Sequence, residues 1–147
     1  LDDMLTKFQF HMLSKCFCCV DSQAKTVKHL FFEGELAMAV WKFFGSPSGI
    51  RYAGDHLHVV LANWWYIPAK SERLKFIFRL LPIFVCWNLW KARNIAFYQG
   101  VFVNFHSVCQ AIFSDLRFVY WIKFREFHNI MSWHHFLELV EQRLAKF

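Results

Sequence analysis

Apolar residues recur every three or four positions along most of this sequence, and this spacing strongly restricts the folds open to it. The clearest case follows Asn104, where one apolar stripe contains Phe105, Val108, Cys109, Ile112, Phe113, Leu116, Val119 and Tyr120. That period matches the 3.6 residues per turn of an α-helix, and no segment alternates as a half-buried strand would. The sequence predicts an all-α chain, one compact helical domain of about five to six helices.

Capping residues divide the chain into separate helices. The expected helices cover residues 2–13, 27–44, a short segment after 55, 71–98, a segment from 104, and a last one from 132. Their expected N-terminal caps include Asp55, Ser71, Asn104 and Ser132. Gly45 and Gly100 are expected to end the second and the longest helix, and Pro82 is expected to kink the longest one.

Composition limits the class of protein. The 147 residues leave room for one domain, and a hydrophobic share of 56% excludes disorder. An aromatic share of 20% indicates that some rings meet another part of a larger protein. The chain opens with Leu1, so we interpret it as a piece of a longer product.

The compartment follows from cysteine usage and from hydropathy. Five cysteines, an odd number, occur without a secretory signal, so we expect an intracellular protein of the nucleus or cytoplasm that is not secreted. The most apolar run, residues 80–90, is about half as long as a bilayer requires. The sequence therefore predicts no membrane association.

A group of cysteines ahead of one histidine is the candidate metal site. Cys16 and Cys19 have the spacing at which two thiolates hold one tetrahedral zinc ion from a tight turn, and His29 follows. Glu33, one helical turn beyond His29, would complete an N-terminal Cys/His knuckle with four ligands. The alternative is that the cysteines are reduced, partly buried apolar residues and that His29 is a surface residue.

Basic residues with interleaved aromatics form the second candidate site. The net charge of +6 favours an acidic partner, with RNA or DNA the obvious one. The candidate nucleic-acid-binding residues are Lys70, Arg73, Lys75, Arg79, Lys91 and Arg93, with Arg117, Lys123 and Arg125 following on the next helix. The alternative is that the rings form the core and the charges a solvated face.

Catalytic patterns are missing from the sequence. No Ser/His/Asp or Cys/His nucleophile arrangement can be assembled with any specificity, and no glycine-rich phosphate loop occurs. His56, His58, His134 and His135 are best interpreted as solvated side chains. We therefore expect a protein that is not an enzyme.

Three segments carry a family resemblance. They are KCFCC at 15–19, TVKHLFFEGELAMAVWKFF at 26–44 and LPIFVCWNLWKARN at 81–94. In order and spacing they resemble the zinc-binding domain that follows the reverse transcriptase in plant non-LTR (LINE-type) retrotransposons. The resemblance covers residues 1–117, while residues 118–147 resemble the helical connector toward a downstream ribonuclease H region.

The resemblance implies a polyprotein part whose chemistry is done by its neighbours. It implies a non-catalytic accessory domain that binds RNA or DNA and supports the polymerase, with flanking polymerase and ribonuclease H domains as partners. Cys16, Cys19 and His29 match the presumed zinc ligands, whereas the fourth position, usually a cysteine, is Gly34 here. The alternative function is a purely structural helical module that packs against those domains without metal or nucleic acid.

Overall fold

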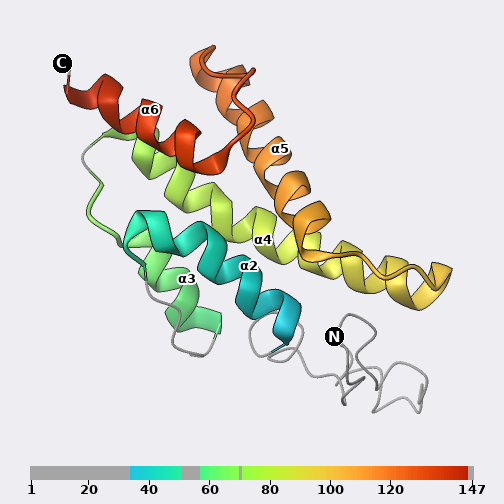
Figure 1. Cartoon of the computed structure of the whole chain (residues 1–147). Coiled ribbons are helices and arrows are strands. Elements are labelled where there is room, and N and C mark those ends of the chain that lie inside the picture. Colours follow the sequence, from blue (N-terminus) through green and yellow to red (C-terminus); the bar gives the residue numbers. More distant parts are fainter. Residues whose placement is uncertain (1–33, 51–56, 70, 146–147) are drawn as a thin grey trace.

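The computed structural model describes residues 34–50, 57–69 and 71–145, and these ranges are helical (Figure 1). Their elements are α2 (Glu35–Gly45), the 3-10 turn η3 (Ser46–Ser48), α3 (Leu57–Trp65), α4 (Glu72–Gln99), α5 (Phe105–Phe124) and α6 (Trp133–Ala145). The prediction of an all-α domain is confirmed, with five α-helices in the described ranges. The expected helix over 2–13 and the Cys/His knuckle lie outside the described residues.

The predicted caps of the two longest helices are confirmed. The Ser71 hydroxyl accepts a hydrogen bond from the Leu74 amide at 3.2 Å, and the Asn104 carboxamide oxygen accepts one from the Ser107 amide at 2.8 Å. These bonds satisfy backbone donors that a first helical turn leaves without partners. Gly100 follows α4 with a φ of 67°, a left-handed conformation that glycine adopts without a steric penalty.

The second helix begins later than its apolar period predicts. Gly34 is extended, with φ −64° and ψ 149°, and stands as the residue before α2, which starts at Glu35. The prediction of one continuous helix through 27–44 is therefore wrong at this point. Glycine disfavours a helix interior by about 1 kcal/mol relative to alanine, which suits it to the flanking position.

The longest helix, α4, organises the described fold. It contacts α2, α3, α5 and α6, and Figure 1 shows it running through the molecule with α2 and α6 along it and α5 crossing it. The helix continues through Pro82, which is buried. No helix within the described ranges, α4 included, is long and apolar enough to cross a bilayer.

Aromatic side chains join the helices at the core. Trp64 of α3 lies 6.5 Å from Trp41 of α2 and 5.9 Å from Phe78 of α4, measured between ring centroids. Trp133 of α6 meets Phe44 of α2 at 5.4 Å. These tilted and edge-to-face contacts are the arrangements that ring quadrupoles favour. Much of the aromatic content is thus used to hold α2, α3, α4 and α6 together.

The last helices share this core. The expected boundary after residue 117 falls inside α5, where Leu116 and Tyr120 on either side of it are both fully buried. Phe136 of α6 is also fully buried and lies 5.0 Å from the Tyr120 ring. The side chains of α6 therefore complete the same hydrophobic core as those of α4 and α5.

Candidate nucleic-acid interface

Five residues on α4, each four positions after the last, form a row that winds around the helix. We call this set the outer row: Lys75, Arg79, Ile83, Trp87 and Lys91. Neighbours four apart are in contact but are offset by about 40° around the axis at 3.6 residues per turn, so the row follows an inclined ridge that turns by about 160° from Lys75 to Lys91. The first four are exposed and Lys91 is half-buried. The row has cations near both ends and two apolar side chains in its middle.

Three of the six predicted nucleic-acid-binding residues lie in the outer row: Lys75, Arg79 and Lys91. Lys75 lies 3.7 Å from the Glu72 carboxylate, an exposed pair of the kind that contributes little. Lys70 lies outside the described residues. Arg93 is only 2% exposed, and its guanidinium donates to the Asn94 side chain at 2.9 Å. Burial keeps Arg93 away from any ligand on the outer surface in this structure.

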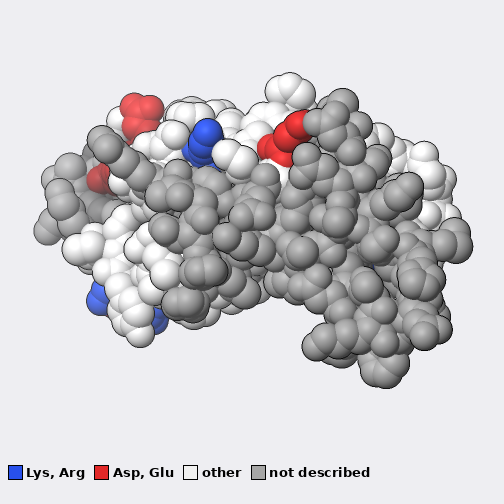
Figure 2. Space-filling model, turned by 90° about the horizontal axis from the view of Figure 1, so that it is seen from below, with Lys and Arg blue, Asp and Glu red and all other residues white. Residues whose placement is uncertain are grey.

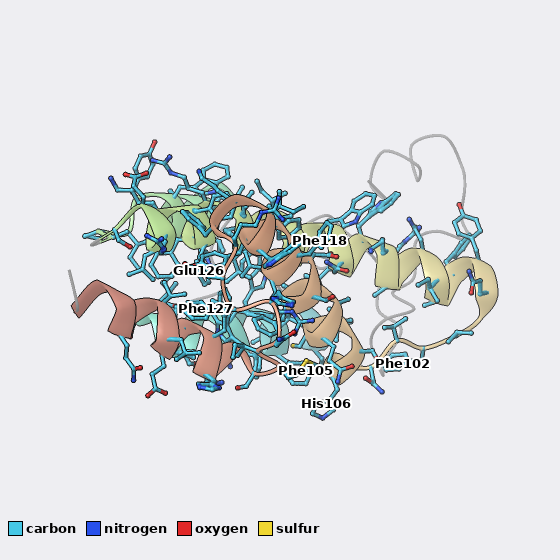
Figure 3. All side chains as sticks on the ribbon, turned by 90° about the horizontal axis from the view of Figure 1, so that it is seen from above. Phe102, Phe105, His106, Phe118, Glu126 and Phe127 are labelled. Carbon is cyan, nitrogen blue, oxygen red and sulfur yellow. The ribbon has the colours of Figure 1, made fainter. Side chains whose placement is uncertain are left out.

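Arg73 is engaged with a carboxylate far away in the sequence. Its Nε donates to Glu126 Oε1 at 2.8 Å and its second nitrogen contacts Oε2 at 3.5 Å. The Tyr120 hydroxyl also donates to Oε1, at 3.0 Å. Figure 3 shows Glu126 and the neighbouring Phe127 lying between α4 and α6. Arg73 thus ties the start of α4 to the segment after α5.

The pKa values of this cluster follow from its contacts. The hydrogen bond from Arg73 to Glu126 is the main cause that raises the guanidinium pKa above its usual value. Burial is the main cause that raises the pKa of the Tyr120 phenol, and the Glu126 charge adds to it. Both groups therefore keep their protons, and the cluster holds one cation, one anion and a neutral phenol.

Indole rings lie in the outer row and beside it. Trp87 is 50% exposed and stacks on Trp90 with a centroid distance of 5.3 Å and an angle of 24° between the rings. The Lys91 ammonium lies 5.7 Å from the Trp87 ring centroid, within cation–π range. Trp65 of α3 donates its indole N–H to the Arg79 carbonyl at 3.1 Å, which holds this ring beside the row.

The end of α5 adds two further exposed cations. The Lys123 ammonium lies 4.7 Å from the ring centroid of Phe76, the residue next to Lys75. The Arg125 guanidinium lies 4.6 Å from the Trp121 ring. Contact across the two helices therefore places Lys123 next to the first turns of α4. The sequence indicated both cations and the aromatics interleaved with them, but not which ring each cation contacts.

Glu126 is the functional contact that sequence reasoning missed. It lies in a connector after the left-handed residue Arg125, where helical periodicity no longer indicates which side chains turn inward. An acidic residue in a connector is ordinarily exposed, yet Glu126 is buried. The only sequence signal was an unbalanced group of cations, and it did not single out this carboxylate.

On one face of the molecule the described basic side chains do not form a cluster. On the face drawn in Figure 2, the described lysine and arginine side chains lie at separate places. A hollow of about 500 Å³ opens between η3 and the end of α3 beside Tyr66 and Ile67, and none of the described residues that line it is charged. Among the described residues the cations gather instead along the outer row and at the end of α5, and this surface is the candidate interface.

The candidate zinc ligands Cys16, Cys19, His29 and Glu33 lie outside the described residues. Within the described ranges no group of three or more His, Cys, Asp and Glu side chains is placed to hold a metal ion. Burial raises the pKa of the Cys86 and Cys109 thiols to about 12. Neither thiol belongs to a group of candidate ligands within the described ranges. Gly34, the expected fourth position, offers no side chain.

Comparison with known proteins identifies no relative. No family model, no curated protein and no solved structure matches this chain. Its function has to be inferred from the residues and geometry described above.

Proposed function

We propose that this chain is a non-catalytic accessory domain of a retrotransposon reverse transcriptase that binds RNA or DNA through the outer row of α4 and supports the polymerase. The observation that carries the proposal is the row itself, with cations near both ends and Ile83 and Trp87 between them. The retroelement assignment rests on the three sequence segments at 15–19, 26–44 and 81–94.

The charges of the surface support binding to a polyanion. The row holds three cations, and Lys123 and Arg125 add two more at the end of α5. The described acids near them are Glu72, which pairs with Lys75, Asp115, which accepts from Asn88, and the buried Glu126, which pairs with Arg73. The balance on this side is therefore positive, and phosphate contacts release counterions from the nucleic acid.

The proposal is tested by titrating the purified chain into labelled single-stranded and duplex oligonucleotides across a salt series, with fluorescence anisotropy as the measurement. Phosphate contacts predict that log affinity falls linearly with log salt concentration. Replacing both Lys75 and Arg79 with alanine is expected to make that slope shallower by about 1.4 to 1.8, since each phosphate contact contributes roughly 0.7 to 0.9.

The matched control is Lys42→Ala, which removes an exposed cation from α2 without touching the outer row. This variant is expected to change the slope of log affinity against log salt concentration less than the double variant does. Binding that does not respond to salt, or a Lys42→Ala effect equal to that of the double variant, would contradict the proposed interface.

Zinc belongs to the proposal through Cys16, Cys19, His29 and Glu33, and bound there it would fix the N-terminal turn. The purified chain is expected to carry one zinc ion that a Cys16→Ser and Cys19→Ser variant loses, together with a lower melting temperature. Equal metal content and equal melting temperatures in both proteins would remove zinc from the proposal. The proposed role of the outer row would not be affected.

A second candidate function is a structural module that packs against the polymerase or ribonuclease H domain without metal or nucleic acid. The observation that favours it is the pair Ile83 and Trp87, each 50% exposed and one helical turn apart. This function predicts that the chain binds no oligonucleotide at any salt concentration and co-purifies with a flanking domain when the two are expressed together.

A further inference from the structure

We propose that the outer row binds single-stranded rather than duplex nucleic acid, with a base stacked on Trp87 and phosphates held by Arg79 and Lys91. This inference rests on the proposed function and names the class of ligand. It is argued from the order of side chains along α4 and from the state of the Trp87 ring.

The row places two apolar side chains between cations, over a distance that suits a few nucleotides. With a rise of 1.5 Å per residue, Arg79 and Lys91 are about 18 Å apart along α4. Ile83 and Trp87 lie between them. A ligand that spans both cations must therefore cover two exposed apolar side chains. The middle of such a ligand has to offer apolar surface, while the backbone of the ligand remains charged.

Single strands meet this requirement and duplexes do not. In a duplex each base face is covered by the neighbouring base pair, and the outer surface presents phosphates and groove edges. An exposed indole against that surface loses water without gaining a stacking partner. An extended single strand has free base faces, and base–aromatic stacking together with a basic track is the usual basis of its recognition.

The Trp87 ring is prepared for such a partner. Its stacking on Trp90 limits the rotation of both indoles, so less side-chain entropy remains to be lost on binding. The Lys91 ammonium lies over the Trp87 ring, where a stacked base would take its place. The displaced ammonium remains within reach of the phosphate of that nucleotide. One substitution at Trp87 should therefore affect the single strand far more than the duplex.

A protein partner would use the same apolar pair differently. To cover Ile83 and Trp87 it would also have to desolvate Arg79 and Lys91, which requires acidic residues at both ends of its own surface. Nucleic acid supplies negative charge at regular intervals without that condition. The charge pattern thus favours the single strand, and association with protein becomes one of the outcomes of the test.

The experiment measures anisotropy of labelled oligo-dT of about 16 nucleotides, the upper site size for a single-strand-binding fold, and of a mixed-sequence duplex of equal length. The full chain is compared with Trp87→Ala, Trp87→Phe and Phe102→Ala. Phe102 is an exposed ring outside the row, in the connector between α4 and α5 (Figure 3). Circular dichroism confirms that each variant is folded.

The inference predicts tighter binding of oligo-dT than of duplex, a loss of about tenfold or more for Trp87→Ala with oligo-dT, and recovery of most of that loss in Trp87→Phe. Duplex binding should change less than twofold, and Phe102→Ala should resemble the unchanged protein. Equal affinity for both probes, or equal effects of Trp87→Ala and Phe102→Ala, would overturn the inference. The proposed function would still stand in that case if binding remained dependent on salt.

Two further results separate the remaining alternatives. If neither probe binds, the proposed function fails and the inference falls with it. If Trp87→Ala leaves oligo-dT binding intact but abolishes self-association in size-exclusion chromatography, the face is a protein interface and the inference is wrong.

Discussion

Replacing Glu126 with alanine is expected to destabilise the chain by about 3 kcal/mol, because it removes the carboxylate that Arg73 and Tyr120 share. The Glu126 side chain is 7% exposed and that of Arg73 30%, so water replaces the lost contacts poorly. A hydrogen bond to a charged group contributes roughly 1.5 to 3 kcal/mol, and Glu126 accepts two short ones, at 2.8 Å and 3.0 Å.

A Glu126→Gln variant separates charge from geometry. Both short bonds end on Oε1, so a glutamine oxygen at that position still accepts from Arg73 Nε and from the Tyr120 hydroxyl. Only the weak 3.5 Å contact to Oε2 is replaced by an amide that faces another donor. We therefore expect a smaller loss for this variant, about 1 to 2 kcal/mol, which reflects the missing charge.

The assay is urea denaturation followed by far-ultraviolet circular dichroism and by tryptophan fluorescence. A change of 1 kcal/mol corresponds to about 2 to 4 °C in melting temperature for a chain of this size, so Glu126→Ala should melt about 6 to 12 °C lower. The control is Glu138→Ala on the exposed side of α6, expected within about 0.5 kcal/mol of the unchanged protein. Equal effects at Glu126 and Glu138 would refute the assignment of a buried, shared carboxylate.

Two other predictions concern buried polar groups. Asn88→Asp places a second carboxylate beside Asp115, whose oxygen lies 3.0 Å from the Asn88 amide. We expect the free energy of unfolding to fall by about 2 kcal/mol, and this loss should lessen as pH falls below about 4. Urea denaturation at several pH values measures it. Because burial raises the pKa of the Cys109 thiol to about 12, the folded state keeps its proton while the unfolded chain loses it above about 8.5. Stability should therefore fall by up to roughly 1.4 kcal/mol per pH unit between those values, and Cys109→Ala should flatten this slope in thermal melts, whereas an unchanged slope would contradict the burial argument.

Helix periodicity and capping chemistry made most of the fold predictable. The inward face of α5 was predicted correctly, since Ile112, Leu116 and Tyr120 are fully buried where the apolar stripe places them. Ser71 and Asn104 cap the helices that they were expected to cap. These features depend on local geometry, which a few neighbouring residues specify. The start of α2 was misplaced because apolar spacing outweighed the conformational preference of Gly34.

The candidate interface was only partly predictable. The basic residues of α4 stood out in the sequence, but their composition alone did not separate Arg79, which is exposed, from Arg93, which is buried. Exposure depends on which neighbours cover a helix face, and those neighbours are far away in the sequence. The same limit applies to Trp87 and Trp41, two similar indoles of which only the first reaches the surface.

The amino-acid sequence by itself determined that this chain forms helices, where α4, α5 and α6 begin, and which face of α5 turns inward, because propensity, capping and a 3.6-residue period act over one or two turns. Only the tertiary structure decided which cations remain available. Packing of α4 against α5 and the following connector joined Arg73 to Glu126 across 53 residues. The same packing left Lys75, Arg79, Ile83 and Trp87 of the outer row exposed and Lys91 half-buried.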